Sequence, residues 1–145
     1  MKTIIALVDF SDVTFKVLKQ AHTLATAFGS QVVILHVVPP EPVVLDFGVA
    51  PTVMRDPSPE TVRAEGLRLQ ELEESLTKHG VQATSRQIHG TTLDSLLEEC
   101  DKSNPDIIIV GSHRHGAFYN LVVGSITAGV LKSAKCPVLV VPTQE

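Results

Sequence analysis

The sequence predicts an α/β domain in which a five-stranded parallel sheet has helices on both faces. Short apolar runs rich in branched residues alternate with longer segments whose apolar residues recur at helical spacing. This alternation indicates parallel strands joined by helices. Most of the apolar runs are unbroken, as expected of strands that are buried on both faces. Because crossovers between parallel strands are right-handed, the helices fall on both sides of the sheet.

The composition is that of one globular domain covering residues 1–145. Hydrophobic residues make up 43% of the chain and charged residues 19%, which argues against disorder. The net charge of −4 argues against nucleic-acid and membrane partners, which prefer a basic surface. No apolar run approaches the roughly 18 residues that span a bilayer. We expect a cytoplasmic protein whose two cysteines, Cys100 and Cys136, are reduced because they lack metal or redox spacing.

The first half of the chain predicts two buried strands, at residues 3–8 and 31–37, joined by a helix that Gly29 ends. Ser11 or Asp12 is the expected N-cap of this helix. Its apolar positions at helical spacing are Val17, Leu18, Ala21, Leu24, Ala25 and Phe28.

A proline-rich segment at residues 39–57 follows the second strand. It has no stable period and predicts a long loop, for which a functional role and a disordered insertion remain equally open. Ser58 and Pro59 suit the N-cap and the first position of a second helix, which Gly80 ends. A less fully covered strand is expected at residues 81–88.

The second half predicts two further helices and two further strands. The segment "HGTTLDSLLEEC" begins a helix, with Thr91 and Asp94 as a capping box, and a strongly apolar strand follows at residues 106–111. The last strand, at residues 137–141, begins at Pro137 and is followed by Pro142. The helix before it, in "SITAGVLKSAK", is expected to turn four residues inward: Ile126, Val130, Leu131 and Ala134.

Ligands of such sheets bind beyond the carboxyl ends of the strands, and the segment "GSHRHGAFYNLVVGS", residues 111–125, is the strongest candidate there. Gly111 ends a strand, and Gly124 and Ser125 precede a helix, so backbone N–H groups and a hydroxyl could hold a phosphate. Spacing alone leaves a purely steric role for the glycines equally open. No GxxxxGK[ST] loop is present and no GxGxxG follows the first strand, which argues against a dinucleotide dehydrogenase.

The histidines and serines give no catalytic or metal signature. His113 and His115 lack accompanying cysteines or clustered carboxylates, so a surface turn or a neighbour of phosphate is expected there. His36 and His89 end strands and either line the crevice or merely cap it. No G-x-S-x-G elbow and no nucleophile with a base is visible, so no catalytic residue and no metal site is assigned.

The chain resembles the universal stress protein family along nearly its whole length. The matching residues are "IIALVDFSD", "LHVVPP", "IHGTTLDSLLEEC" and, most specifically, "PDIIIVGSHRHGAFYNLVVGSITAGVLKSAKCPVLVVP". The resemblance implies a Rossmann-like or flavodoxin-like sheet with strand order 3-2-1-4-5. ATP-binding members of the family carry the motif G-x2-G-x9-G-[ST]. Gly111, Gly124 and Ser125 match it here, and Arg114 replaces the second glycine.

The resemblance also implies where an adenine nucleotide, ATP or AMP/ADP, would bind. Asp9 and its neighbours would lie beside the ribose and adenine, Val37 would offer backbone atoms to the adenine edge, and Gly90 would allow close approach. Mg²⁺ could accompany the nucleotide, with Asp9 as one ligand. The implied site comprises Asp9, Phe10, Ser11, Val37, Gly90, Gly111, Ser112, Arg114, Gly116, Gly124, Ser125 and Ile126.

Arg114 has two opposing effects on such a site. It cannot adopt a left-handed conformation as cheaply as glycine, yet its guanidinium offers five donors and a permanent charge that suit phosphate. We expect that it replaces a backbone contact and that nucleotide still binds, in a stress-response binding and signalling protein with at most slow hydrolysis. A nucleotide-free member that acts through protein contacts, and a slow ATPase, remain the alternatives. The apolar last strand, 137–141, is an edge in the implied order and predicts a homodimer.

Overall fold

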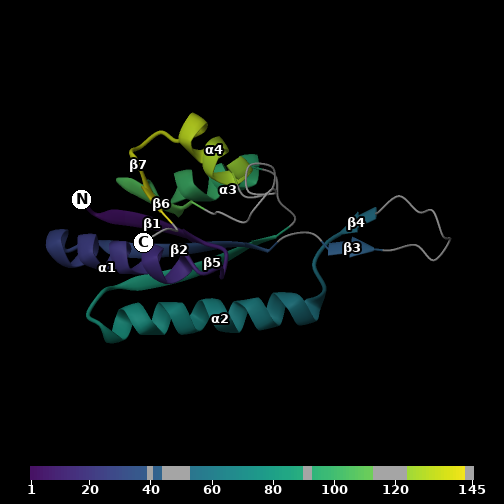
Figure 1. Cartoon of the computed structure of the whole chain (residues 1–145). Coiled ribbons are helices and arrows are strands. Elements are labelled where there is room, and N and C mark those ends of the chain that lie inside the picture. Colours follow the sequence, from purple (N-terminus) through teal and green to yellow (C-terminus); the bar gives the residue numbers. More distant parts are fainter. Residues whose placement is uncertain (39–40, 44–52, 90–92, 113–123, 143–145) are drawn as a thin grey trace.

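A computed structural model describes residues 1–38, 41–43, 53–89, 93–112 and 124–142 (Figure 1). Five parallel strands form one sheet in the order β5-β2-β1-β6-β7. They are β1 (Thr3–Val8), β2 (Gln31–Val38), β5 (Ala83–His89), β6 (Ile107–Gly111) and β7 (Val138–Val141). Numbered along the chain within the sheet, this order is 3-2-1-4-5, which confirms both the fold class and the strand order.

Four helices among the described residues cover the two faces of this sheet. They are α1 (Thr14–Phe28), α2 (Pro59–Lys78), α3 (Leu93–Lys102) and α4 (Gly124–Ser133). The helices α1 and α2 lie on one face, and α3 and α4 on the other (Figure 1). None of the helices in the described part of the chain is long and apolar enough to cross a bilayer.

The unbroken apolar strands supply a core on both faces, because successive side chains of a strand point in opposite directions. In β1, Ile4 and Ala6 pack toward α1 and α2, whereas Ile5 packs toward α3 and α4. The three side chains are fully buried. The carboxyl ends of the central strands are aligned by the register that places Val8 beside His36.

Local sequence signals set several helix ends. Ser58 caps α2 by accepting a hydrogen bond from the backbone N–H of Thr61 at 3.2 Å, and Pro59 is the first helical residue. Gly29 ends α1 in the left-handed conformation with φ of 65°. The predicted capping box of α3 includes Thr91, which lies outside the described residues.

The predicted cap of α1 is wrong. The N-cap is Val13, which has no side chain that can accept, and neither Ser11 nor Asp12 takes that role. The backbone closes the turn instead, since the N–H of Thr14 donates to the carbonyl oxygen of Ser11 at 3.0 Å.

Three apolar residues expected to face inward are exposed instead. Phe28 is 57% exposed at the last residue of α1, Leu131 is 52% exposed, and Ile126 is 44% exposed. In α4 the buried line passes through Val130, so Leu131 is rotated about 100° away from the sheet. Ile126 lies in the first turn of α4, at the edge of a cleft described below.

For the proline-rich segment, residues 39–57, the sequence predicts a long loop. Two of its parts pair as an antiparallel ribbon, β3 (Glu41–Val43) with β4 (Val53–Arg55), which lies beyond the main sheet (Figure 1). Pro42 is accommodated in β3 because a two-stranded ribbon leaves backbone groups on its outer edges unpaired.

Candidate functional site

A cleft of about 320 Å³ opens at the carboxyl ends of β1, β2 and β6. It lies where the chain order of the strands reverses, because β1 is followed by β2 on one side and by β6 on the other. Ligands of open α/β sheets bind at such switch points. The lining residues are Leu7, Val8, Asp9, Val13, Leu35, His36, Val37, Glu65, Leu96, Val110, Gly111, Ile126 and Thr127.

Asp9 is the first residue after β1 and brings a carboxylate to the cleft. Its Oδ1 accepts a hydrogen bond from the backbone N–H of Ser11 at 3.0 Å, which fixes the side chain against the turn that leads to α1. A carboxylate held in this way can accept hydrogen bonds from the hydroxyl groups of a ligand.

Gly111 ends β6 at a point where the chain has no room for a side chain. A Cβ atom on this residue would lie 2.4 Å from Cγ1 of Val13, which lines the same cleft. The glycine therefore allows the end of β6 to approach the turn between β1 and α1. This close packing sets the width of the cleft between the two strand ends.

The first turn of α4 lies beside the end of β6. The hydroxyl of Thr127 donates to the carbonyl oxygen of Gly111 at 3.2 Å, and Ile126 and Thr127 both line the cleft. The N-terminus of a helix presents unpaired N–H groups and the positive end of the helix dipole. This arrangement favours an anionic group of a ligand at this end of the cleft.

Phe10 follows Asp9 but its side chain lies on the other side of the turn. It lines a separate groove between α1 and α2, with its ring centroid 4.2 Å from that of His36 and 4.3 Å from Cζ of Arg68. Its φ of 60° is unusual for a residue with a Cβ atom. Strained conformations of this kind are held by their surroundings, and here the aromatic and cationic neighbours hold Phe10.

His36 is the buried polar residue of the cleft and is 2% exposed. Its Nδ1 lies 2.9 Å from the carbonyl oxygen of Val8, and its Nε2 lies 3.0 Å from Oε2 of Glu65 in α2. The imidazole thus connects the ends of β1 and β2 to α2. Of the two roles considered for His36, the structure places it in the crevice, where it also secures the neighbouring strand.

Val13, Glu65 and Thr127 line the cleft but are not predicted as site residues from the sequence. Glu65 had a signal, because it occupies the inward line of α2 with Leu69 and Leu76, where an acidic residue needs a buried partner. Gly66, next to it, allows α2 to approach β5, since a Cβ atom there would lie 3.2 Å from Nε2 of Gln87.

The implied nucleotide residues divide into four groups. Lining the cleft are Asp9, Val37, Gly111 and Ile126, whereas Phe10 and Ser11 line the groove. Ser112 follows β6 and donates its N–H to the carbonyl oxygen of Val141 at 2.9 Å, and Gly124 and Ser125 begin α4. Gly90, Arg114, Gly116 and the two histidines beside Arg114 lie outside the described residues.

The two cysteines lie apart from the cleft and are free thiols. Burial raises the pKa of Cys100 to about 12, and burial also raises the pKa of Cys136. Both side chains therefore remain protonated near neutral pH and act as small core residues. Among the described residues, no group of three or more acidic, histidine or cysteine side chains is placed to hold a metal ion.

These features define a doubly wound α/β protein with a ligand cleft at the carboxyl edge of its sheet. The chain belongs to the universal stress protein family, whose model matches residues 1–142. Universal stress protein MJ0531 of Methanocaldococcus jannaschii is 28% identical over 97% of this chain and 81% of its own length. Universal stress protein YxiE of Bacillus subtilis is 29% identical over 92% of this chain and 94% of its own.

Solved structures share the fold at low sequence identity. A universal stress protein in complex with cAMP has a TM-score of 0.70 at 22% identity, covering 99% of this chain and 98% of that one. The universal stress protein of Archaeoglobus fulgidus in complex with dAMP gives 0.67 at 20%, with coverages of 97% and 96%. A family protein from Arabidopsis thaliana with AMP bound gives 0.58 at 19%, with coverages of 99% and 93%.

Proposed function

We propose that this protein binds an adenine nucleotide in the cleft and acts as a binding and signalling module of the stress response. The observation that supports this most directly is the meeting of Asp9, Gly111 and the first turn of α4 in one cleft. A carboxylate suited to ribose hydroxyls and a helix N-terminus suited to phosphate lie at its two sides. Family members with AMP, dAMP and cAMP support the ligand class.

In the proposed pose the adenine lies beside Val37 at the end of β2, and the ribose contacts Asp9. The phosphates lie toward Gly111 and the N-terminus of α4, where Gly124, Ser125 and Arg114 contact them. ATP is the proposed nucleotide, with Mg²⁺ held by its phosphates and Asp9. The assignment of Arg114 to this site rests on its place in the sequence motif, and that of Gly90 and Gly116 rests on the resemblance to the family.

The first test is direct. Purified protein is denatured, and the supernatant is separated by ion-exchange chromatography. A co-purified adenine nucleotide, or micromolar binding of AMP, ADP or ATP by calorimetric titration, is the expected result. Absence of both would favour the nucleotide-free alternative, and ADP that accumulates with time from added ATP would identify a slow ATPase.

Two variants locate the phosphates. Gly124→Val should abolish ATP binding with little change in melting temperature, because a branched side chain would project where the backbone meets a phosphate oxygen. Arg114→Gly should weaken ATP more than adenosine and flatten the salt dependence of ATP binding, since a charged donor is lost. A glycine variant that binds ATP more tightly than the natural protein would show that Arg114 blocks the site.

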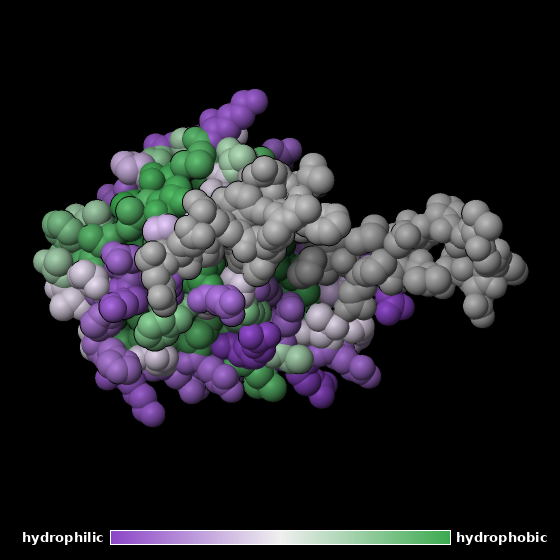
Figure 2. All heavy atoms as spheres, in the orientation of Figure 1, coloured by the Kyte–Doolittle hydropathy of each residue, from purple (hydrophilic) through white to green (hydrophobic). Residues whose placement is uncertain are grey.

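We also propose that the protein forms a homodimer through β7. This strand pairs with β6 on one side, and no described strand pairs with its other side. Its Val140 is 37% exposed, and Leu131 of α4 is 52% exposed. Hydrophobic side chains gather over α4 and β7 at the upper left of Figure 2. An apolar edge strand favours pairing with a second copy about a two-fold axis.

A further inference from the structure

The two hydrogen-bond contacts of the His36 ring require one proton more than a neutral imidazole and an ionised Glu65 together carry. The carbonyl oxygen of Val8 and the carboxylate of Glu65 are both acceptors, and they face the two ring nitrogens of His36 at 2.9 and 3.0 Å. A neutral imidazole has only one N–H and can donate to only one of them. Both contacts are satisfied only when a second proton lies between Nε2 and Oε2 of Glu65.

This requirement does not depend on which of the two groups formally owns the proton. An imidazolium beside a carboxylate and an imidazole beside a carboxylic acid contain the same number of protons. Once that proton leaves, a lone pair of the ring faces either the carboxylate of Glu65 or the carbonyl of Val8. The His36 side chain is 3% exposed, so water cannot readily replace the lost partner. One of the two contacts must therefore break.

The surroundings of His36 tie this proton to the shape of the cleft. The Val8 contact holds the end of β1, immediately before Asp9, and the Glu65 contact holds α2 against the end of β2. The Phe10 ring packs on His36, and the guanidinium of Arg68 from α2 packs on Phe10. The side chain of Glu65 is 23% exposed and gives the proton a path to solvent.

The charged groups around the imidazole come from three elements. Asp9 of the turn after β1 lines the same cleft, and α2 supplies Glu65 and, through Phe10, Arg68. On the β5 side, Gln87 is the register partner of His36, and the ring of His89 lies 3.1 Å from Oε1 of that glutamine. The cleft residues of β6 and α4 are uncharged.

We propose that His36 and Glu65 share one proton that holds the mouth of the cleft in its nucleotide-binding shape, so that binding weakens as the pH rises. The pair acts as a positioning element, because His36 holds the carbonyl oxygen of Val8, immediately before Asp9, and Glu65 ties α2 to the same ring. The proposal rests on the proposed function for its ligand. Release of the proton to solvent leaves a neutral ring and a carboxylate, and the turn that holds Asp9 loosens.

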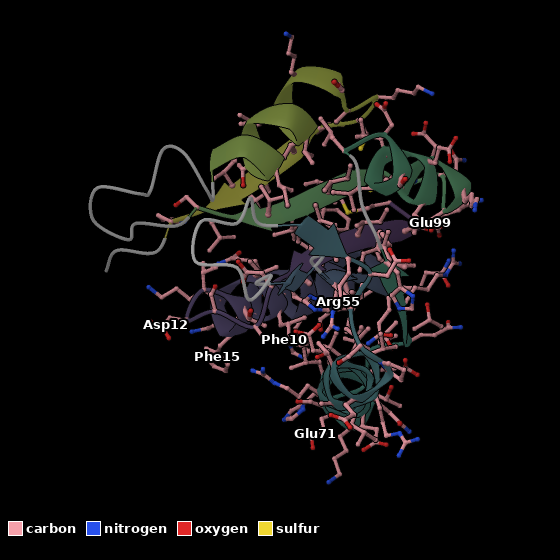
Figure 3. The ribbon with its side chains drawn as sticks, turned by 90° about the vertical axis from the view of Figure 1, so that its right-hand side faces the viewer. Phe10, Asp12, Phe15, Arg55, Glu71 and Glu99 are labelled. Carbon is pink, nitrogen blue, oxygen red and sulfur yellow. The ribbon has the colours of Figure 1, made fainter. Side chains whose placement is uncertain are left out.

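The discriminating variant is Glu65→Gln. Its amide N–H can donate to Nε2 while the Nδ1–H of a neutral ring donates to Val8, so both contacts survive without the shared proton. Glu71→Gln is the matched control, because Glu71 lies on the same helix but lines the groove between α1 and α2. In Figure 3, which looks toward the carboxyl ends of the strands, Glu71 lies across that groove from Phe15.

The binding experiment measures AMP affinity calorimetrically between pH 6.5 and 9.5. We expect the natural protein and Glu71→Gln to lose about tenfold in affinity relative to Glu65→Gln over this range, about the effect of one charge-assisted hydrogen bond. The ionisation of the AMP phosphate is common to all three proteins and cancels in the ratio. Parallel curves for the natural protein and Glu65→Gln would overturn the proposal.

A second measurement needs no nucleotide. Nitrogen-15 spectra of the imidazole groups in the ligand-free protein should show that Nε2 of His36 loses a proton as the pH rises, and that in Glu65→Gln it is already unprotonated at pH 6.5. An Nε2 signal that stays constant from pH 6 to 10 in the natural protein would overturn the shared proton. If the ring titrates as expected but AMP binds to none of the proteins, the proposed function fails and the link to AMP binding with it.

Discussion

The cleft at the strand ends and the groove between α1 and α2 lie on opposite sides of the turn that contains Asp9 and Phe10. The groove is the larger of the two, at about 580 Å³ against about 320 Å³. It is lined by side chains of two helices and of the turn, including Phe15, which is 73% exposed. The cleft is lined mainly by the ends of three strands, together with Val13 before α1, Leu96 of α3, the first turn of α4 and Glu65 of α2.

This difference shows why the smaller hollow is the better candidate site. Positions in the cleft are fixed by strand pairing and by the buried contacts of His36, so a ligand meets atoms that are already in place. The groove is lined largely by helix side chains, whose positions depend on their rotamers as well as on the backbone. The topology of the sheet therefore indicates the location of the site more reliably than the volume of a hollow does.

The largest effect is expected for Gly111→Val, which fills the cleft. The new Cβ would overlap Val13, so we expect a loss of about 1–3 kcal/mol in the free energy of unfolding and no measurable AMP binding. Gly129→Ala is the control, because its Cβ would overlap Leu93 between α4 and α3, away from the cleft. Both variants should have a lower melting temperature than the natural protein. Calorimetric titration should show a loss of AMP binding for Gly111→Val only.

A smaller effect is expected for Asp9→Asn, which removes the charge at the cleft but retains an acceptor for the N–H of Ser11. We expect AMP affinity to fall roughly tenfold, since hydrogen bonds to charged groups are stronger than those to neutral ones. Asp12→Asn, at an exposed residue of the same turn, should leave affinity unchanged. If the Asp9 variant and the natural protein bind AMP with equal affinity, Asp9 does not contact the nucleotide.

The groove also provides a control for the proposed dimer interface at β7. Val140→Lys should weaken the dimer at least about tenfold, because a charge would be buried beside the paired edge strand. Phe15→Lys, in the groove, should leave the dimer intact. Sedimentation at several concentrations measures both. If only the Phe15 variant dissociates, the groove is the interface between copies and β7 is not.

The smallest effect is expected at the amino ends of the strands, at the end of the sheet away from the cleft. Oδ2 of Asp106 accepts from the backbone N–H groups of Thr3, at 3.0 Å, and Lys2, at 2.6 Å, and these hydrogen bonds lower the pKa of Asp106. Because the folded pKa lies below the unfolded one, the stabilisation is present above the unfolded pKa and is lost as the pH falls through the folded pKa. Asp106→Asn should therefore lower the melting temperature slightly at pH 7, less at pH 2, and leave AMP binding unchanged.

The sequence by itself determined the sheet and its order of elements. Runs such as residues 3–8 and 31–37 are too apolar to lie anywhere but between two layers of helices, and Gly29 and Ser58 fix helix ends by local chemistry. The motif G-x2-G-x9-G-[ST] predicted that Gly111 and the start of α4 lie at the carboxyl ends of the parallel strands. Gly111 ends a strand, and the helix that follows begins on the same side of the sheet.

Only the tertiary structure decided which side chains share the cleft. Phe10 and Asp9 are neighbours in the chain, yet their side chains lie in different hollows, because the left-handed turn at Phe10 separates them. Glu65 and His36 meet across 29 residues, since α2 packs closely on β5 at Gly66. Periodicity gives the buried side of one element, whereas the partner of a buried polar group depends on how two elements pack together.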